Sequence, residues 1–438
     1  MGTANQADDQ VEPDSHQVAQ LAKQVECDTV VCRVILTNAL ISDPEDPRAP
    51  AHAELHIQRH RIDGRSEVES WLLAESWWAE TFLPPSFSDL ARWGLRIIPW
   101  MVGSHFGAPV RRILARRSEA SKGDRLWKQS VFWLLWFGRL VGSVIGLIAA
   151  LLATPLLLGA LAILLLVGLL PIQQVREALL KIQLKVASTL GDSHVLVSRP
   201  IEAASIVGQV RRDIYWLASR CKVLVLVAHS QGGAVAHQAL QGGVPPKLRI
   251  LFTFGSGLKK LEELKSLLSS GHSYLRSAVL TLVALLFFGL SSAWFALMLT
   301  TKELKTLASH DFVAQVPTML IYLLLSAVVL YAGLRDHIRG IDLPDLHRWI
   351  ERLRNKLHWV DCFASVDPVS NGPVIEMPEV ESWSVEVCNQ SSFLGDHTSY
   401  WANRDQFVTL LISQLAHPQL RNEAGLLPAD EFLTESRS

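Results

Sequence analysis

One short stretch of this chain, residues 223–236, places a serine between an apolar run and a segment of small residues. The apolar residues 223–227 lead through Ala228 and His229 to Ser230, and Gly232 and Gly233 follow almost at once. Such a pattern is typical of a sharp strand-to-helix turn that lifts a serine hydroxyl above a parallel sheet. Gly232 is expected to remove the Cβ that would crowd this turn. The alternative is a buried, glycine-rich strand end with only a packing role.

Acidic and histidine residues follow the serine in a consistent order. Further strands are expected at residues 248–256, 358–365 and 384–389. Asp367 lies just beyond the second of these strands, and His397 lies in the loop after the third. A reactive serine needs a base, and the base needs an acid that orients it. The order serine, acid, histidine is the one found in hydrolases that use this strand-to-helix turn.

Residues 220–410 therefore resemble the α/β-hydrolase superfamily, in particular its lipase-like and esterase-like serine hydrolases. The resemblance rests on the turn around Ser230, on the segment Asp367-Pro368-Val369 and on the segment Asp396-His397 with Tyr400 and Trp401. It implies an α/β fold, a mainly parallel sheet with helices on both faces. It also implies that Ser230 is the nucleophile, Asp367 the acid and His397 the base, with no cofactor.

Two features depart from the family pattern. Ala228 replaces the usual first glycine of the turn, and no His-Gly pair marks an oxyanion loop in the N-terminal part. The backbone N–H of Gln231, at the start of the expected helix, is the predicted first oxyanion donor. A second donor is expected from a turn after residues 33–36, near Asn38 and Ala39.

Several nearby residues offer alternatives. Asp361 is a second possible acid, but it falls inside its strand, whereas Asp367 falls beyond it. His229 is expected to point into the sheet as a packed side chain, and His237 on the following helix is expected to be structural. Asp396, next to the histidine, is expected to serve the hydrogen bonds of its own loop.

Three long apolar runs add a second theme. The chain is 49% hydrophobic with a mean hydropathy of +0.22, which is high for a soluble enzyme. Residues 131–172 contain a single charge, Arg139, and residues 278–299 and 312–334 contain none. About 20 apolar residues suffice for one membrane crossing. A run that is apolar on every side cannot be an amphipathic surface helix, so these runs predict transmembrane segments.

The predicted site limits how these runs can cross a membrane. Ser230 and His397 must lie on one side, so the second and third runs are expected to form a hairpin. Strands expected at residues 29–38, 51–62 and 69–76 must in turn join the sheet that contains residues 222–229. The first run is therefore expected to be a hairpin or a re-entrant segment with its turn at Thr154-Pro155.

The sequence predicts one catalytic domain interrupted by two transmembrane hairpins, or about four spans. The expected segments are an N-terminal tail (1–24), the first part of the domain (25–130), a hairpin (131–172), the nucleophile half (173–274), a hairpin (275–334), the acid and histidine half (335–416) and a C-terminal tail (417–438). Lysine and arginine crowd the domain side, whereas the loop at 300–311 holds only Lys302 and Lys305. This bias predicts a cytoplasmic domain.

Composition excludes little else. The net charge of −1 gives no reason to expect a nucleic-acid partner, and the five cysteines show no metal-ligand spacing. Two functional classes remain. The first is a membrane-embedded serine hydrolase that cleaves an acyl ester of a lipid or other amphiphile, with membrane lipids as its surroundings. The second is a non-catalytic membrane scaffold or signalling protein that keeps the fold.

Overall fold

The structure of the protein is a computed structural model. It describes residues 25–27, 30–40, 46, 48–61, 66–78, 81–83, 85–115, 126–167, 191–270, 343–364, 366–370, 372–374, 384–389 and 395–416, with scattered positions at 173–177 and 279–341. The expected terminal tails, 1–24 and 417–438, lie outside this part of the chain, as does most of the expected hairpin at 275–334.

A four-stranded parallel sheet forms the centre of the molecule. Its strands are β5 (Leu224–His229), β6 (Leu248–Phe254), β7 (His358–Ala364) and β8 (Ser384–Val387), hydrogen-bonded in that order. Every neighbouring pair is parallel. Helices α6 (Gln231–Gln241), α7 (Leu258–Ser270) and α10 (Pro344–Arg354) lie between the strands in sequence. The fold is therefore α/β, and the strand positions predicted here are confirmed to within a few residues.

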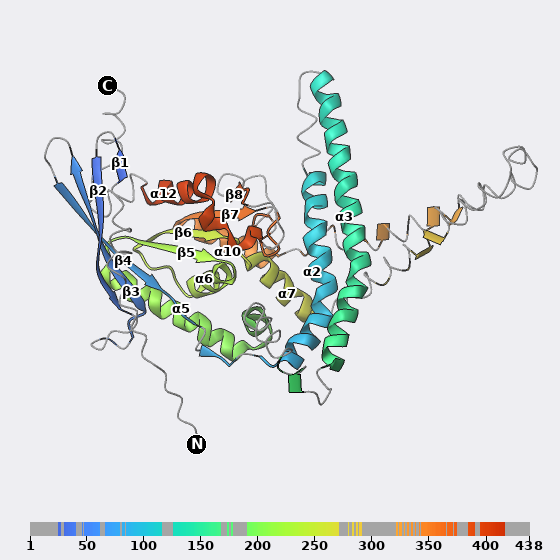
Figure 1. The fold of residues 1–438 in the computed structure, drawn as a ribbon, viewed down its shortest axis with the longest axis horizontal. Helices are drawn as coiled ribbons and strands as arrows, with labels where there is room; N and C mark the ends of the chain where they lie inside the picture. The colour runs from blue at the N-terminus through green and yellow to red at the C-terminus, as the bar shows by residue number, and fades with distance from the viewer. Residues whose placement is uncertain are drawn as a thin grey trace, which may run out of the picture.

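Helices cover both faces of this sheet (Figure 1). Helix α5 (Pro200–Arg220), α6 and α10 pack on one face, around Leu251 of β6. On the other face, Phe252 and Phe254 of the same strand pack against the C-terminal turns η7 (Arg404–Val408) and α12 (Thr409–Leu415). Because alternate residues of a strand point to opposite faces, one apolar strand supplies both cores.

The N-terminal strands form a sheet of their own, so the expectation that they join the parallel sheet was wrong. Strands β1 (Val25–Cys27), β2 (Val30–Leu40), β3 (Ala51–Arg61) and β4 (Ser66–Glu75) pair antiparallel in sequence order. Chain length explains the antiparallel pairing: only residues 62–65 separate β3 from β4, whereas a parallel crossover needs about a dozen residues or more.

The first apolar run also differs from its prediction. Residues Leu126–Val167 form one continuous helix, α3, so the turn expected at Thr154-Pro155 was wrong. Helix α2 (Phe87–Ala115), which precedes α3 in the chain, lies antiparallel against it (Figure 1). The indole Nε1 of Trp136 donates to the carbonyl oxygen of Ile113 at 2.8 Å.

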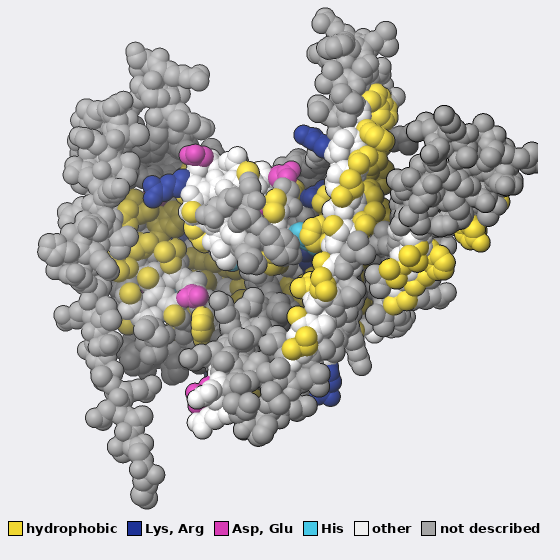
Figure 2. Space-filling view, turned by 45° about the vertical axis from the view of Figure 1, so that its right-hand side comes forward, with side chains coloured by type: hydrophobic (Ala, Val, Ile, Leu, Met, Phe, Trp, Pro, Cys, Tyr) yellow, Lys and Arg dark blue, Asp and Glu magenta, His cyan; other side chains and the backbone are white. Residues whose placement is uncertain are grey.

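Among the described residues, no helix has both the length and the apolar character that crossing a membrane requires. Many large apolar side chains on α3 are nevertheless exposed, and Figure 2 shows them along much of that helix. Those most exposed are Phe137, Ile145, Leu156 and Ile163.

Candidate active site

Ser230 occupies a strained turn between β5 and α6. Its backbone has φ 56° and ψ −125°, and it is the only described residue other than glycine with a positive φ. Such a conformation costs about 1–3 kcal/mol and persists only where the surroundings enforce it. Here the Ser230 N–H donates to the carbonyl oxygen of Phe254 at 3.1 Å, and the Ser230 carbonyl oxygen accepts from Gly257 N at 2.9 Å. Both partners lie at the carboxyl end of β6, so the sheet itself fixes the turn.

The close approach that demands a glycine falls on Gly233 rather than Gly232. A Cβ at Gly233 would lie 2.4 Å from Ser256 Oγ and 3.1 Å from its Cβ, so Ser256 would have to shift to admit it. A Cβ at Gly232 would lie 3.6 Å from the ring of Trp78, an ordinary contact. The first turn of α6 therefore packs directly on Ser256, two residues after the end of β6.

The three residues singled out by the sequence meet at the carboxyl edge of the parallel sheet. His397 is carried by α11 (Gly395–Thr398), and its Nε2 lies 2.9 Å from Ser230 Oγ. Its Nδ1 lies 3.0 Å from both carboxylate oxygens of Asp367. A carboxylate can only accept, so Nδ1–H donates to Asp367. The Nε2 atom is then free to accept the hydroxyl proton of Ser230.

Asp367 is fully buried and held by several donors. Its carboxylate accepts the Val369 N–H at 2.7 Å, the Ser370 hydroxyl at 3.0 Å and the Tyr400 hydroxyl at 2.9 Å. Burial alone would raise the pKa of this carboxyl, but the hydrogen bonds from His397, Val369 and Tyr400 together hold its pKa below the usual value. The group therefore stays ionised next to the imidazole.

The alternative acid, Asp361, lies elsewhere. It sits inside β7, where its carboxylate accepts from Thr253 Oγ1 at 2.7 Å and from Val374 N at 3.2 Å. Burial raises the pKa of Asp361 to about 6. Because the Asp361 carboxylate is bonded to Thr253 and Val374 and that of Asp367 to His397, the geometry favours Asp367 as the acid.

The other histidines have different surroundings. His229 stacks on the ring of His397, with centroids 4.7 Å apart, and on that of Phe254, at 4.6 Å. The sequence predicted a side chain packed into the sheet, whereas the structure also places the ring of His229 against that of His397. His237 is 2% exposed and lies against Trp349, which agrees with a structural role. Burial lowers the pKa of His237 to about 3.

One of the predicted oxyanion donors lies at the site. Gln231 is the first residue of α6, where backbone N–H groups have no partner within the helix. The turn expected after residues 33–36 was wrong, because β2 continues to Leu40. Within it, Asn38 pairs with Glu54 and Ala39 with Ala53 in the antiparallel sheet.

The segment that follows β4 approaches the turn at Ser230 instead. Trp78 lies next to Gly232, and its indole hydrogen-bonds to Asp192, whose pKa is raised by burial. The side-chain amide of Gln231 donates to Ser193 Oγ. Two neighbouring residues, Asp192 and Ser193, thus bond to Trp78 and Gln231 next to the turn.

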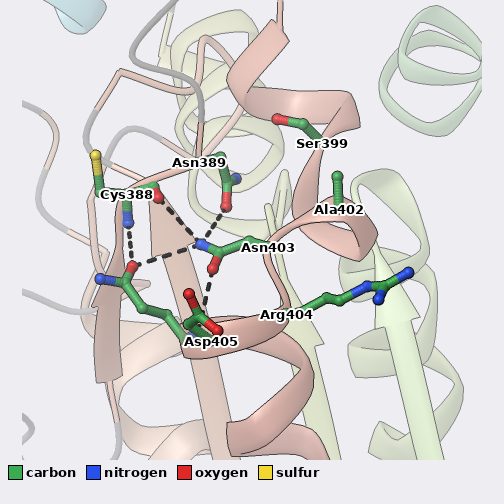
Figure 3. A pocket seen from close by; sticks show the side chains of 8 residues that line it. Cys388, Asn389, Ser399, Ala402, Asn403, Arg404 and Asp405 are labelled. Atoms are coloured by element: carbon green, nitrogen blue, oxygen red, sulfur yellow. Dashed lines mark hydrogen bonds between the residues drawn. The ribbon is translucent and has the colours of Figure 1, made fainter.

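A separate hollow of about 600 Å³ lies behind the histidine loop (Figure 3). Its lining is Cys388, Asn389, Ser399, Ala402, Asn403, Arg404, Asp405 and Gln406. Asn403 organises it: its side-chain amide donates to Asn389 Oδ1 at 2.9 Å, and its Oδ1 accepts from Gln406 N. Ser230, Asp367 and His397 are not part of the lining, so this hollow is not the approach to the hydroxyl of Ser230.

The sequence prediction gave no role to two residues that support the acid. Tyr400 and Ser370 both donate to the Asp367 carboxylate. Ser370 lies three residues after the acid and Tyr400 three residues after the histidine, so their proximity in sequence was a usable signal. Among the described residues, no group of histidine, cysteine or acidic side chains could hold a metal ion.

Comparison with known proteins adds no relative. No protein-family model, no curated protein and no solved structure matches this chain.

Proposed function

We propose that this protein is a serine hydrolase of the α/β-hydrolase type that cleaves acyl esters. The observation that carries the proposal is one pair of contacts of His397. Its Nε2 is 2.9 Å from the Ser230 hydroxyl, and its Nδ1 is 3.0 Å from the Asp367 carboxylate. This is the geometry required of a nucleophile, a general base and the group that orients the base.

The proposed reaction has two steps. Ser230 Oγ attacks the ester carbonyl carbon while His397 Nε2 takes the hydroxyl proton. The resulting oxyanion is stabilised by the Gln231 N–H at the positive end of α6. The intermediate then expels the alcohol, which receives the proton from His397, and leaves an acyl group on Ser230. A water molecule, deprotonated by His397, hydrolyses this acyl-enzyme and restores the serine.

Asp367 contributes by orientation and by charge. Its hydrogen bond keeps the proton on Nδ1 of His397, so that Nε2 faces Ser230 as an acceptor. When His397 takes the serine proton, the ionised carboxylate stabilises the imidazolium. Ser370 and Tyr400, which also donate to this carboxylate, hold it in place.

The proposed substrate is a lipid or another amphiphilic ester, and the proposed location is a membrane. Support comes from the apolar runs of the sequence and from the exposed side chains of α3, such as Ile145 (60% exposed) and Leu156 (77%). Apolar surface of this extent is expected to be covered by another apolar phase. The four-span count is not retained, because the first run is a single helix. The charge bias of the sequence still favours a cytoplasmic domain.

A non-catalytic scaffold is the second candidate. The observation that favours it is the position of Asn38 and Ala39 within β2, which leaves Gln231 without the second oxyanion donor expected from the sequence. An enzyme of this kind would lose much of its transition-state stabilisation with one donor missing.

Covalent labelling distinguishes the two candidates. The full-length protein in detergent is treated with a fluorophosphonate probe, alongside Ser230→Ala and Ser256→Ala variants. Labelling of the wild type and of Ser256→Ala, but not of Ser230→Ala, is expected for the hydrolase. Ser256 is a suitable control because it is a buried serine close to the same turn. A folded wild-type protein that takes up no probe would favour the scaffold.

A further inference from the structure

Three aromatic rings form a column beside Ser230. His229 lies in the middle, stacked on Phe254 with an interplanar angle of 18° and on His397 with an angle of 26°. Phe254 ends strand β6 and His229 ends strand β5, so two adjacent strands fix the positions of these two rings. The ring of His397 is the only one of the three that comes from a short turn.

A hydrogen bond joins the same two histidines. His229 Nε2 lies 3.1 Å from the carbonyl oxygen of His397. A carbonyl only accepts, so the proton of neutral His229 sits on Nε2. This bond links the end of β5 directly to α11, the four-residue turn that carries His397. So short a helix has little internal hydrogen bonding of its own to hold it.

Gly255, which has no Cβ, lets the ring of His229 and the carboxylate of Asp367 come close together. A Cβ at that position would lie 3.3 Å from His229 Nε2 and 3.1 Å from an Asp367 carboxylate oxygen. Gly255 also has φ 55°, a conformation that favours glycine. Partial removal of the ring from water, together with the nearby His397, lowers the pKa of His229 to about 4. His229 is therefore neutral at neutral pH and does not repel the imidazolium that forms on His397 during the proposed reaction.

We propose that His229 is a positioning residue for His397: its ring sets the plane of the His397 imidazole, and its Nε2 ties the turn carrying His397 to strand β5. The proposal rests on the proposed hydrolase function for its catalytic consequence, but not for the tie itself. His229 does not exchange protons with the substrate. Its effect is on how often His397 points at Ser230.

Two substitutions separate the ring from the hydrogen bond. His229→Phe keeps a flat ring between Phe254 and His397 but has no nitrogen, whereas His229→Gln keeps a donor in place of Nε2 but has no ring. His358→Ala is the control, because His358 is an exposed histidine at the start of β7, bonded to Gln414. The full-length variants are compared by thermal unfolding, by hydrolysis of p-nitrophenyl butyrate and by hydrogen exchange of residues 395–398.

For His229→Phe we expect a normal melting temperature, a kcat lower by about tenfold and an unchanged KM, since one hydrogen bond is worth about that factor. Exchange in residues 395–398 should become faster. For His229→Gln we expect part of the lost kcat to return, and for His358→Ala no change. A His229→Phe variant with wild-type kcat would reduce His229 to a packing residue.

Failure of the proposed hydrolase function and failure of the proposed role of His229 give different results. If the wild type shows no hydrolysis that depends on Ser230, the proposed function fails and the exchange measurement alone decides the role of His229. Faster exchange of residues 395–398 in His229→Phe would then support the tie, and unchanged exchange would overturn it.

Discussion

The parallel-sheet region and the helix pair α2–α3 differ in what they leave in contact with water. At the carboxyl edge of the sheet, the polar groups of Asp367 are buried and each is matched by donors. On α3, apolar side chains such as Phe137 and Ile145 are each 60% exposed. Buried polar groups need partners, and exposed apolar surface of this extent needs a cover. The buried acid is thus satisfied within the chain, whereas the helix pair is expected to need an apolar environment.

The largest expected effect concerns the two carboxylates of the sheet region. Asp367→Asn should reduce kcat by about 10⁴-fold, because an amide at that place favours the wrong tautomer of the histidine. Asp361→Asn should leave kcat nearly unchanged, since Asp361 bonds to Thr253 and Val374 rather than to His397. Hydrolysis of p-nitrophenyl butyrate by the purified variants measures both. A severe loss in Asp361→Asn alone, with both proteins folded, would transfer the acid role to Asp361.

The next effect tests the helix pair. Ile145→Asp combined with Leu156→Asp should move much of the protein out of the carbonate-resistant membrane fraction, since one charge within a membrane costs about 3 kcal/mol. The matched control is Leu83→Asp with Ile201→Asp, two residues that are each 82% exposed but lie outside α3. Equal membrane retention of both double variants would remove the support that α3 gives to membrane attachment.

These regions also differ in how much of them the sequence could predict. The motif around Ser230 is local, so its residues indicated the turn, the helix and the position of the sheet edge. The order of Asp367 and His397 was sufficient because strands of a parallel sheet bring their carboxyl ends together. The short connection between β3 and β4 was an overlooked signal for their antiparallel pairing, whereas the packing of α2 along α3 depends on a segment outside the apolar run. The apolar run alone did not contain that information.

The close packing of the serine turn gives a smaller effect. Gly233→Ala should lower the free energy of unfolding by about 1–3 kcal/mol, because the new Cβ would meet Ser256 Oγ at 2.4 Å. Gly232→Ala should cost less, since its nearest contact is 3.6 Å from the Trp78 ring. Chemical denaturation of both variants checks the difference. Restoration of stability by Ser256→Gly in the Gly233→Ala background would identify the clash as the cause.

The smallest expected effect is a pH dependence from Asp361. Its pKa of about 6 in the folded protein lies above the value of 3.8 expected without burial. The folded state therefore binds this proton more tightly, and the free energy of unfolding should fall as pH rises from about 4 to 6. Asp361→Asn removes this contribution. The stability difference, wild type minus variant, should decrease over that window and stay constant above it; a rising difference would contradict the assigned direction.

The most direct test of the central claim is to locate a covalent adduct on the intact protein. Wild type and His397→Ala are treated with a fluorophosphonate, digested and mapped by mass spectrometry. We expect one stoichiometric adduct on Ser230 in the wild type and little or none in His397→Ala, because the hydroxyl then lacks its base. An adduct on another serine, or equal labelling of Ser230 in both proteins, would contradict it.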